Sequence, residues 1–442
     1  MAGLSSYVPL SIGECKSLSC DKPNIILITL DTTRAGRLHC YGYTRLTSPS
    51  LDNLATKSVI YTSALAPSSW TLPSHASLFT GKFTSSHGAR YDPEGPLNLS
   101  SAIANKPSWS QYRVRSISDN EKTLAEILKS YGYKTGAVVA GPWLKKIFGL
   151  DKGFTYYDDS QISSLNGRRA SQVTSSALQW LKKVSKDKFF LFLNYFDPHY
   201  PYSPPEEFIY SFLPKGSLYP GKQLSVVEKN ALYDAEILYM DYYIGQLFDN
   251  LKRLNLYDNM LLIITSDHGD LLGEHGIFGH GKFLFQEELH IPLIVKYPGT
   301  EISSKEEDGY IQLVDILPMI LNRLNIPFPQ DIQGNISPDI KHPIFAEVYP
   351  LPAMTPYGEW RALYQGNIKF LWNSKGNTML FNLENDPAEL DNLLPKDPDQ
   401  AKSMALSMNE FLTTLPKQKT SRPIQAIDEK TRESLKGLGY IK

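Results

Sequence analysis

The chain has 442 residues, of which 42% are hydrophobic, enough for a large buried core and for more than one domain. Its formal net charge of −1 excludes a bulk electrostatic attraction to nucleic acid or to an anionic membrane surface. The three cysteines are too few for a disulfide framework, so we expect free thiols, although Cys15 and Cys20 could pair in an exported protein.

Residues 1–22 are expected to be an N-terminal extension. They lack the basic start and the long apolar stretch of a signal peptide. No run in the chain approaches the roughly 18 apolar residues that a transmembrane helix needs. We therefore expect a soluble chain without a membrane span, either cytoplasmic or exported with a trimmed leader.

Continuous apolar runs predict strands that are buried on both faces. These runs are residues 24–30, 134–140, 188–196, 260–266 and 291–297. Helical patterns lie between them, at residues 50–58, 121–133, 171–184 and 226–254. Such alternation predicts an α/β fold with a central, mostly parallel sheet flanked by helices, and we assign this catalytic domain to residues 23–340.

The segment SSWTLPSHASLFTG, residues 68–81, predicts a helix start, because Pro73 suits the first turn of a helix and not its interior. Thr71 then falls just before the helix N-terminus, where free backbone N–H groups favour an anion. Two interpretations of Thr71 stay open at this point. It is either a helix cap or a nucleophile presented to an anionic substrate.

The pattern changes after about residue 340. Short strands joined by turns follow, and Asn-Ser-Lys-Gly-Asn at 373–377 is typical of a hairpin. A helix is expected at 400–413, followed by a basic linker and a terminal helix. We therefore expect a smaller C-terminal α+β subdomain over residues 341–442.

Acidic residues and histidines follow three of the predicted strands. Asp31 ends the first, Asp197 and His199 follow the third, and the adjacent pair Asp267-His268 follows the fourth. Strand ends of a parallel sheet share one rim, so these side chains should meet there. Carboxylate and imidazole groups together bind divalent cations, which predicts one metal ion held by Asp31, Asp267 and His268, with Thr71 completing the site.

Together these motifs resemble the sulfatase family of the alkaline phosphatase superfamily. The resemblance covers residues 23–390 and the last helix, and it implies an alkaline-phosphatase/sulfatase-like fold. The segments that carry it are NIILITLDTTRAGRLHCYGY, SSWTLPSHASLFTGKFTSSHG, YFDPHYPYSPP, TSDHGDLLGEHG, ELHIPLIVKYPG, QLVDILPMILNRLNIP, LFNLENDPAELDNLL and LKGLGYI.

The departures from the family pattern narrow the expected chemistry. Sulfatases convert a Cys or Ser to formylglycine, and here that position holds Thr71, which would give a ketone instead. The family's Arg is replaced by His75, and its second metal-binding Asp by Thr32, a weaker oxygen ligand. A segment that supplies Lys and His to the sulfate group corresponds to 141–146 here, which leaves Lys145 as a substitute.

The resemblance also implies the remaining site residues. His199 matches the histidine that contacts the transferred group or the leaving oxygen, and either His280 or Lys282 matches a late lysine, with His280 preferred. His75, Lys282 and Lys145 are expected to bind the substrate. His275 is either functional or a turn residue, His87 is expected to orient the nucleophile loop, and Arg34 to pair with a local carboxylate.

We thus expect a metal-dependent hydrolase of a small anionic ester. It should cleave phosphate (di)ester or phosphonate bonds through a covalent Thr71 intermediate. Three alternatives remain: a sulfatase that acts without formylglycine, a phospho-group transferase, and a non-catalytic metal-binding homologue. The ligand set does not distinguish Mn²⁺, Ca²⁺, Mg²⁺ and Zn²⁺, and the sequence leaves the oligomeric state open.

Overall fold

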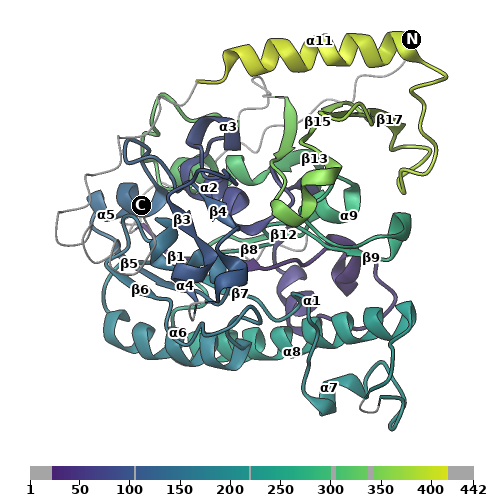
Figure 1. Ribbon diagram of the computed structural model, residues 1–442. Helices are drawn as coiled ribbons and strands as arrows, with labels where there is room; N and C mark the ends of the chain where they lie inside the picture. The colour runs from purple at the N-terminus through teal and green to yellow at the C-terminus, as the bar shows by residue number, and fades with distance from the viewer. Residues whose placement is uncertain (1–21, 104–105, 219–220, 300–304, 337–342, 417–442) are drawn as a thin grey trace, which may run out of the picture.

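The computed structural model describes residues 22–103, 106–218, 221–299, 305–336 and 343–416. It contains a large central sheet with helices on both faces and a smaller antiparallel sheet beneath the long helix α11 (Pro398–Thr414) (Figure 1). The predicted α/β class and the separate C-terminal sheet are both confirmed. The predicted terminal helix and nearly all of the N-terminal extension lie outside the described residues.

The central sheet places the first strand in its middle. The strand order is β11-β2-β12-β8-β1-β7-β5-β6, and β13 pairs with β2. The predicted strands among them are β1 (Asn24–Leu30), β5 (Lys134–Val138), β7 (Phe189–Tyr195), β8 (Met260–Thr265) and β12 (Leu293–Lys296). Since β1 runs parallel to both β7 and β8, the carboxyl ends of these three strands lie at one rim.

Side chains of β1 alternate between two cores, as the pleat of a strand requires. Ile25 and Leu27 belong to one core, which α2 (Thr71–Thr80), α5 (Leu124–Ser130) and α10 (Ile316–Arg323) cover. Ile26 and Ile28 belong to the other, which α1 (Pro49–Ala55), α6 (Ala170–Val184) and α8 (Val226–Arg253) cover. The continuous apolar runs are therefore strands buried on both faces, as predicted.

The sheet differs from the sequence-based expectation toward both of its edges. Three strands were not predicted: β2 (Val59–Leu65), β13 (Lys305–Gln312) and, at the far edge, β6 (Tyr156–Asp158). The first has a polar, half-buried middle and the second is largely charged, so neither shows a continuous apolar run. In addition, β12 runs antiparallel to both β8 and β2, as does β11 (His290–Ile291) to β2, so the sheet is mixed.

The C-terminal sheet is a four-stranded antiparallel meander packed against α11. Its strands are β14 (Ile344–Val348), β15 (Trp360–Gln365), β16 (Ile368–Asn373) and β17 (Met379–Asn382). The predicted hairpin joins β16 to β17, and its Gly376 adopts a φ of +86° that favours glycine. The domain boundary near residue 340 stays a prediction, because 337–342 lie outside the described residues.

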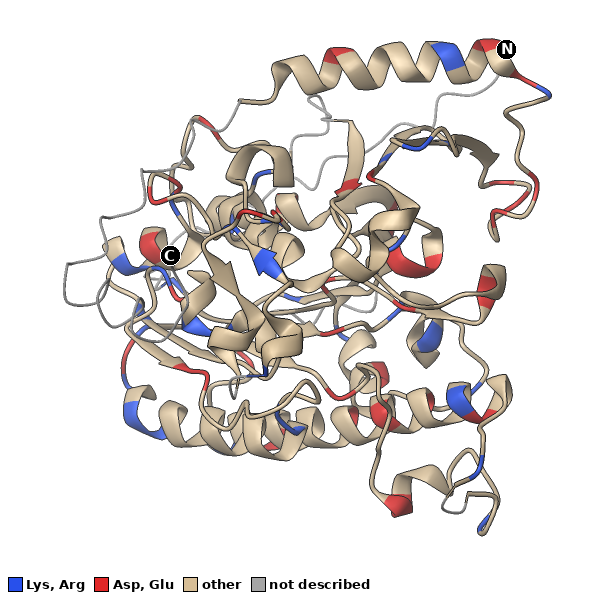
Figure 2. Cartoon of the chain, viewed as in Figure 1, with Lys and Arg blue, Asp and Glu red and all other residues tan. Residues whose placement is uncertain are grey.

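The core beneath this sheet also includes side chains from the catalytic region. Phe83 follows α2 and packs edge-on against Phe345 of β14 and Phe411 of α11, with ring centroids 5.6 and 5.5 Å away. Val314 joins the same apolar cluster. Positive and negative residues are interspersed on the elements visible in Figure 2, which fits the near-zero net charge.

Candidate active site

The predicted ligands Asp31, Asp267 and His268 meet at the rim of the sheet. Thr29 of β1 lies opposite Thr265 of β8, so Asp31 and Asp267, each two residues further on, emerge side by side. Ligand atoms of the two carboxylates and of His268 all lie within 4.8 Å of one another, and the three side chains are fully buried. The parallel register of β1 and β8 therefore creates this cluster.

The electrostatics of the cluster suit a divalent cation. Burial, and then the neighbouring Asp267 carboxylate, raise the pKa of Asp31 well above its usual value. Asp31 Oδ1 and Asp267 Oδ2 are buried without a hydrogen-bond partner, as is the Thr32 hydroxyl. Buried carboxylates that face each other with unsatisfied oxygens need a compensating positive charge. Two carboxylates, one imidazole and hydroxyl oxygens form a donor set that a divalent metal ion fits.

The ring of His268 is oriented for metal binding. Its Nδ1–H donates to the carbonyl of Gly269 at 2.8 Å, which leaves the Nε2 lone pair facing the cluster. Nε2 lies 3.3 Å from Asp267 Oδ2 and 3.4 Å from the hydroxyl oxygen of Thr71. Burial lowers the pKa of His268 well below its usual value, which keeps the ring neutral, as a ligand must be.

Thr71 is the first residue of α2, and not the residue before it as predicted. The N-cap is Trp70, and no side chain caps the helix. The prediction placed the start one residue too late because it relied on Pro73, which fits anywhere in the first turn. Since the Thr71 hydroxyl faces His268 and makes no cap, the structure disfavours the helix-cap interpretation.

His75 lies one turn after Thr71 in α2. Its side chain is fully buried, its Nδ1–H donates to the Thr71 carbonyl at 2.8 Å, and its Nε2 accepts from Thr29 at 2.9 Å. Burial lowers the pKa of His75. Both ring nitrogens are thus occupied by protein groups, which supports a role in fixing the start of α2 against β1 more than the predicted substrate contact.

His199 and His280 lie beside His268. The ring of His280 lies 4.5 Å from that of His268 and 5.0 Å from that of His199, between centroids. Asp270 accepts from His280 Nδ1 at 3.1 Å and from the Tyr202 hydroxyl at 3.0 Å, which fixes the ring of His280. The predicted pair of histidines therefore lies next to the predicted metal ligands.

Burial dominates the protonation equilibria of His199, His280 and Asp270. It lowers the pKa of His199 to about 3, assisted by the neighbouring His280, and that of His280 to about 4, assisted by Lys282. It raises the pKa of Asp270 to about 6. An anionic group bound between the two rings would oppose the shifts of the histidines, because negative charge favours the imidazolium form.

The two candidate lysines are engaged elsewhere. Lys282 Nζ donates to the carbonyl of Phe278 at 2.6 Å, and Lys145 Nζ donates to that of Asp159 at 3.5 Å. Both side chains are partly exposed. Between His280 and Lys282, the short distances from the His280 ring to the rings of His268 and His199 support His280 as the residue facing the site. Substrate contacts by either lysine stay predictions.

The structure also bears on the three remaining residues, Arg34, His87 and His275. Arg34 pairs with Glu274 at 2.8 Å, as predicted. His87 is fully buried and bonds the hydroxyl of Ser77 on α2 at 3.0 Å, which agrees with an orienting role. His275 stacks on Phe285 with ring centroids 4.0 Å apart, so its turn interpretation is supported.

Sequence reasoning missed two residues that touch this site. Asp270 was overlooked although it follows the SDHG motif directly. Asn194 donates from Nδ2 to Asp31 Oδ2 at 3.4 Å and to the Thr29 hydroxyl at 3.2 Å, while its carbonyl oxygen accepts from the Gly141 N–H at 2.9 Å. A lone Asn inside the apolar run 188–196 was the signal that could have revealed it, because buried amides need partners.

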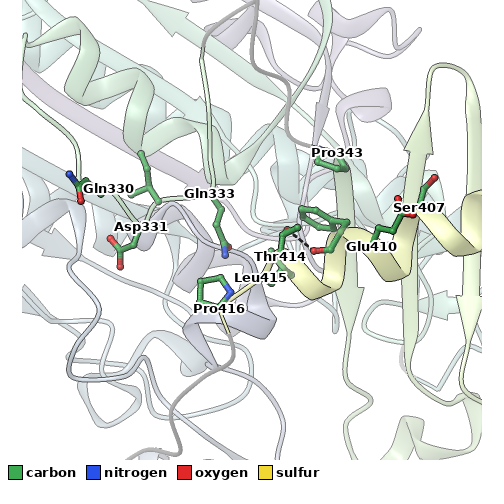
Figure 3. Close-up of a pocket in the computed structure, with 11 residues that line it drawn as sticks. Gln330, Asp331, Gln333, Pro343, Ser407, Glu410, Thr414, Leu415 and Pro416 are labelled. Carbon is green, nitrogen blue, oxygen red and sulfur yellow. Dashed lines mark hydrogen bonds between the residues drawn. The ribbon is translucent and has the colours of Figure 1, made fainter.

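A large hollow lies elsewhere, at the C-terminal end of α11. It has a volume of about 690 Å³, and Figure 3 shows Gln330, Gln333, Glu410 and Thr414 among its lining residues. None of the candidate site residues lines it. The cluster of Asp31, Asp267 and His268 is therefore a separate site, which is defined by its side-chain chemistry and not by the size of a cavity.

A carboxylate-histidine cluster at the rim of such a sheet, beside a helix N-terminus, is typical of hydrolases of the alkaline phosphatase-like class. The chain belongs to the sulfatase family, whose profile matches residues 23–326. A second profile, for the C-terminal region of N-sulphoglucosamine sulphohydrolase, matches residues 273–418. As a member of this family, the protein is an ester hydrolase.

Curated relatives are sulfatases by name. An ulvan-active sulfatase from Formosa agariphila is 25% identical over 404 residues, which span 85% of this chain and 78% of the relative. An arylsulfatase from Clostridium perfringens is also 25% identical, over 84% of this chain and 90% of the relative.

Solved structures confirm the fold. A protein solved with its substrate D-glucosamine-2-N,6-O-disulfate matches 91% of this chain and 100% of its own, with 17% identity and a TM-score of 0.72. The phosphonate monoester hydrolase of Agrobacterium radiobacter matches 90% of this chain and 97% of its own, with 18% identity and a TM-score of 0.71. Among the helices that the structure describes, none is sufficiently long and apolar to cross a membrane.

Proposed function

We propose that this sulfatase-family hydrolase cleaves a phosphorus ester, a phosphate diester or a phosphonate, with Thr71 as the nucleophile. The observation that carries the proposal is the Thr71 hydroxyl, which lies 3.4 Å from His268 Nε2 at the first turn of α2. Helix N-terminal amides stabilise negative charge on a bound ester. The phosphonate monoester hydrolase among the structural relatives supports a phosphorus substrate.

The residues of the chain have distinct tasks in this proposal. Asp31, Thr71, Asp267 and His268 would hold one divalent ion, which when bound makes an alcohol easier to deprotonate. The Thr71 oxygen attacks phosphorus, and its proton passes to solvent. As the new O–P bond forms, the bond to the leaving oxygen breaks in line with it, and His199 or His280 gives that oxygen a proton. Water then attacks phospho-Thr71, releases the product and restores the hydroxyl.

A sulfate ester is the second candidate substrate. The curated relatives named above are sulfatases, and a sulfate ester carries the same single negative charge as a phosphate diester or a phosphonate monoester. The argument against it is the residue at position 71, because Thr cannot give the aldehyde that sulfatases use. The reaction at Thr71 Oγ1 would otherwise follow the same course at sulfur.

The test compares matched p-nitrophenyl esters on Mn²⁺-loaded protein: a sulfate, a phosphate monoester, a phosphate diester and a phosphonate. Thr71→Val removes the hydroxyl with little change in shape, while Thr71→Ser keeps it. We expect turnover of phosphorus esters well above that of the sulfate, a loss of several orders of magnitude in Thr71→Val, and substantial activity in Thr71→Ser.

Wild-type turnover in Thr71→Val would overturn the nucleophile assignment. Preferential sulfate hydrolysis that depends on the Thr71 hydroxyl would instead select the second candidate. Metal binding without turnover of any ester would identify a non-catalytic homologue, in which the fold and the ion are kept and the chemistry is lost.

A further inference from the structure

A fully buried ion pair lies in the C-terminal sheet. Lys369 of β16 places Nζ 2.7 Å from Oε1 of Glu389, and neither side chain is exposed. Burial lowers the pKa of Lys369 and raises that of Glu389, and the charge of each partner opposes the shift of the other. Because hydrophobic residues of similar volume often stabilise a fold as well as a buried ion pair does, such a pair is weak evidence for stability alone.

The second carboxylate oxygen of Glu389 reaches out of the sheet. Oε2 accepts the backbone N–H of Gln286 at 2.6 Å, at the first residue of α9 (Gln286–Leu289). The Gln286 side chain also accepts from the Tyr364 hydroxyl of β15 at 2.9 Å. The C-terminal region therefore contacts the first residue of α9 through two hydrogen bonds, one to its backbone and one to its side chain.

Helix α9 in turn holds the loops of the candidate site. The Glu288 carbonyl accepts the N–H of Gly269, the residue next to His268, at 2.8 Å. The buried Glu288 carboxylate faces the backbone N–H groups of Gly281, Lys282 and Phe283, in the segment that follows His280. A Cβ added to Gly269 would lie 2.0 Å from the Glu287 carbonyl oxygen, so α9 and the metal-ligand loop touch closely.

We propose that Glu389 is a positioning residue for the active site, with Lys369 balancing its buried charge. Lys369 neutralises the buried Glu389 carboxylate, Glu389 holds α9 through the Gln286 N–H, and α9 holds the loops that carry His268 and His280. This role would explain the NDPAEL segment, which the proposed chemistry does not use. Glu389 in this segment adopts a left-handed φ of +53°, which is strained for a residue other than glycine. The proposal rests on the proposed function for the role of His280, whereas its effect on His268 concerns metal affinity alone.

Two double variants isolate the hydrogen bond to Gln286. Lys369→Met with Glu389→Gln removes both charges and keeps an oxygen that can accept from the Gln286 N–H. Lys369→Met with Glu389→Met removes the charges and the acceptor. On each full-length protein we would measure the Mn²⁺ dissociation constant by calorimetry, kcat and KM on the preferred ester, and the melting temperature without metal.

We expect the Gln double variant to stay within about threefold of wild type in metal affinity and kcat. The Met double variant should lose about 10- to 100-fold in metal affinity, the range found when groups that orient metal ligands are removed, with a larger effect on kcat than on KM. If both variants bind metal and turn over as wild type does while melting earlier, the pair only stabilises the fold and the proposal is overturned.

A second comparison covers the case in which the Met double variant does not fold. Gln286→Pro removes the same N–H at a helix position that accepts proline, and Gln286→Ala keeps it. The proposal requires weaker Mn²⁺ binding in the Pro variant than in the Ala variant, and equal binding would contradict it. A failure of Thr71 as nucleophile would leave these metal affinities unchanged, so the two proposals fail separately.

Discussion

At the scale of single residues, the Asp31 carboxylate is expected to favour metal binding and to destabilise the metal-free fold. It is fully buried with one unsatisfied oxygen, and burial together with Asp267 raises its pKa. We predict that Asp31→Asn raises the free energy of unfolding of the metal-free protein by about 1–2 kcal/mol, because a buried like-charge contact disappears. The same variant should lose the rise in melting temperature that Mn²⁺ gives wild type.

Thermal melts with Mn²⁺ and with a chelator test this prediction. Asp52→Asn provides a control, because that partly exposed carboxylate pairs with His39 and is not one of the candidate metal ligands. A metal-dependent rise in Asp31→Asn equal to that of wild type would remove Asp31 from the ligand set.

Sequence could predict Asp31, Asp267 and His268 because each directly follows an apolar strand, and strand ends of a parallel sheet converge. It could not predict Asp270 or Asn194 in the same way. Their roles depend on which side chains other loops and strands place opposite them, as Tyr202 and His280 do for Asp270. Spacing along the chain does not reveal such partners.

At the scale of elements, two buried carboxylates hold the His199 loop between α6 and α8. Asp197 accepts the N–H of Ala170 at 3.0 Å, and Glu236 accepts that of Ser203 at 2.6 Å. Burial raises the pKa of Asp197 to about 7, and burial with the charge of Asp197 raises that of Glu236 to about 8. Both groups therefore keep their protons in the folded state at pH values where the unfolded chain has lost them.

The sign follows from proton linkage. A carboxyl group whose pKa is higher in the folded than in the unfolded state contributes its full stabilisation below about pH 4, where both states are protonated. This stabilisation is lost as the pH rises through about 7 to 8. The loss is at most about 1.4 kcal/mol per pH unit for each group. We predict that Glu236→Gln flattens the fall in the free energy of unfolding between pH 5 and pH 8. Urea titrations across this range test it, with the exposed Glu207→Gln as control, and an unchanged slope would contradict it.

The contact between α6 and β5 depends on Gly136. A Cβ at this position would lie 2.5 Å from the ring of Trp180, far inside normal contact. We predict that Gly136→Ala costs about 1–3 kcal/mol of unfolding free energy, because the packed ring must shift. Denaturant unfolding of a cycle with Trp180→Phe should show coupling, since the smaller ring makes room.

Gly36→Ala is the matched control, because a Cβ there meets nothing within 4 Å. Additive effects of Gly136→Ala and Trp180→Phe would mean that the two residues do not constrain each other. The sequence predicted both β5 and α6 but not this contact, which depends on how α6 lies across the sheet. Edge strands such as β13 were missed for a related reason, because pairing and not an apolar run defines them.

At the scale of the whole molecule, the core of the C-terminal sheet extends into the catalytic region, where the cluster of Asp31, Asp267 and His268 lies between strand ends and α2. The core of the C-terminal sheet includes Phe83, which directly follows the helix that carries Thr71. The sequence predicted a catalytic domain and a C-terminal subdomain with different patterns of strands and helices. It could not show that the two share a core, because nothing in the sequence distinguishes Phe83 from other loop residues.

This shared core makes cooperativity testable. We predict that calorimetric unfolding shows one transition for the described regions and that Mn²⁺ raises its melting temperature. At a Mn²⁺ concentration 100 times the dissociation constant, the free energy of unfolding should rise by about 2.7 kcal/mol. Phe83→Ala should destabilise the protein by about 3–5 kcal/mol and separate the C-terminal sheet as an earlier transition that Mn²⁺ raises less than the main one. Two transitions in wild type, with only one responding to Mn²⁺, would show that the sheets unfold independently and that Phe83 does not couple them.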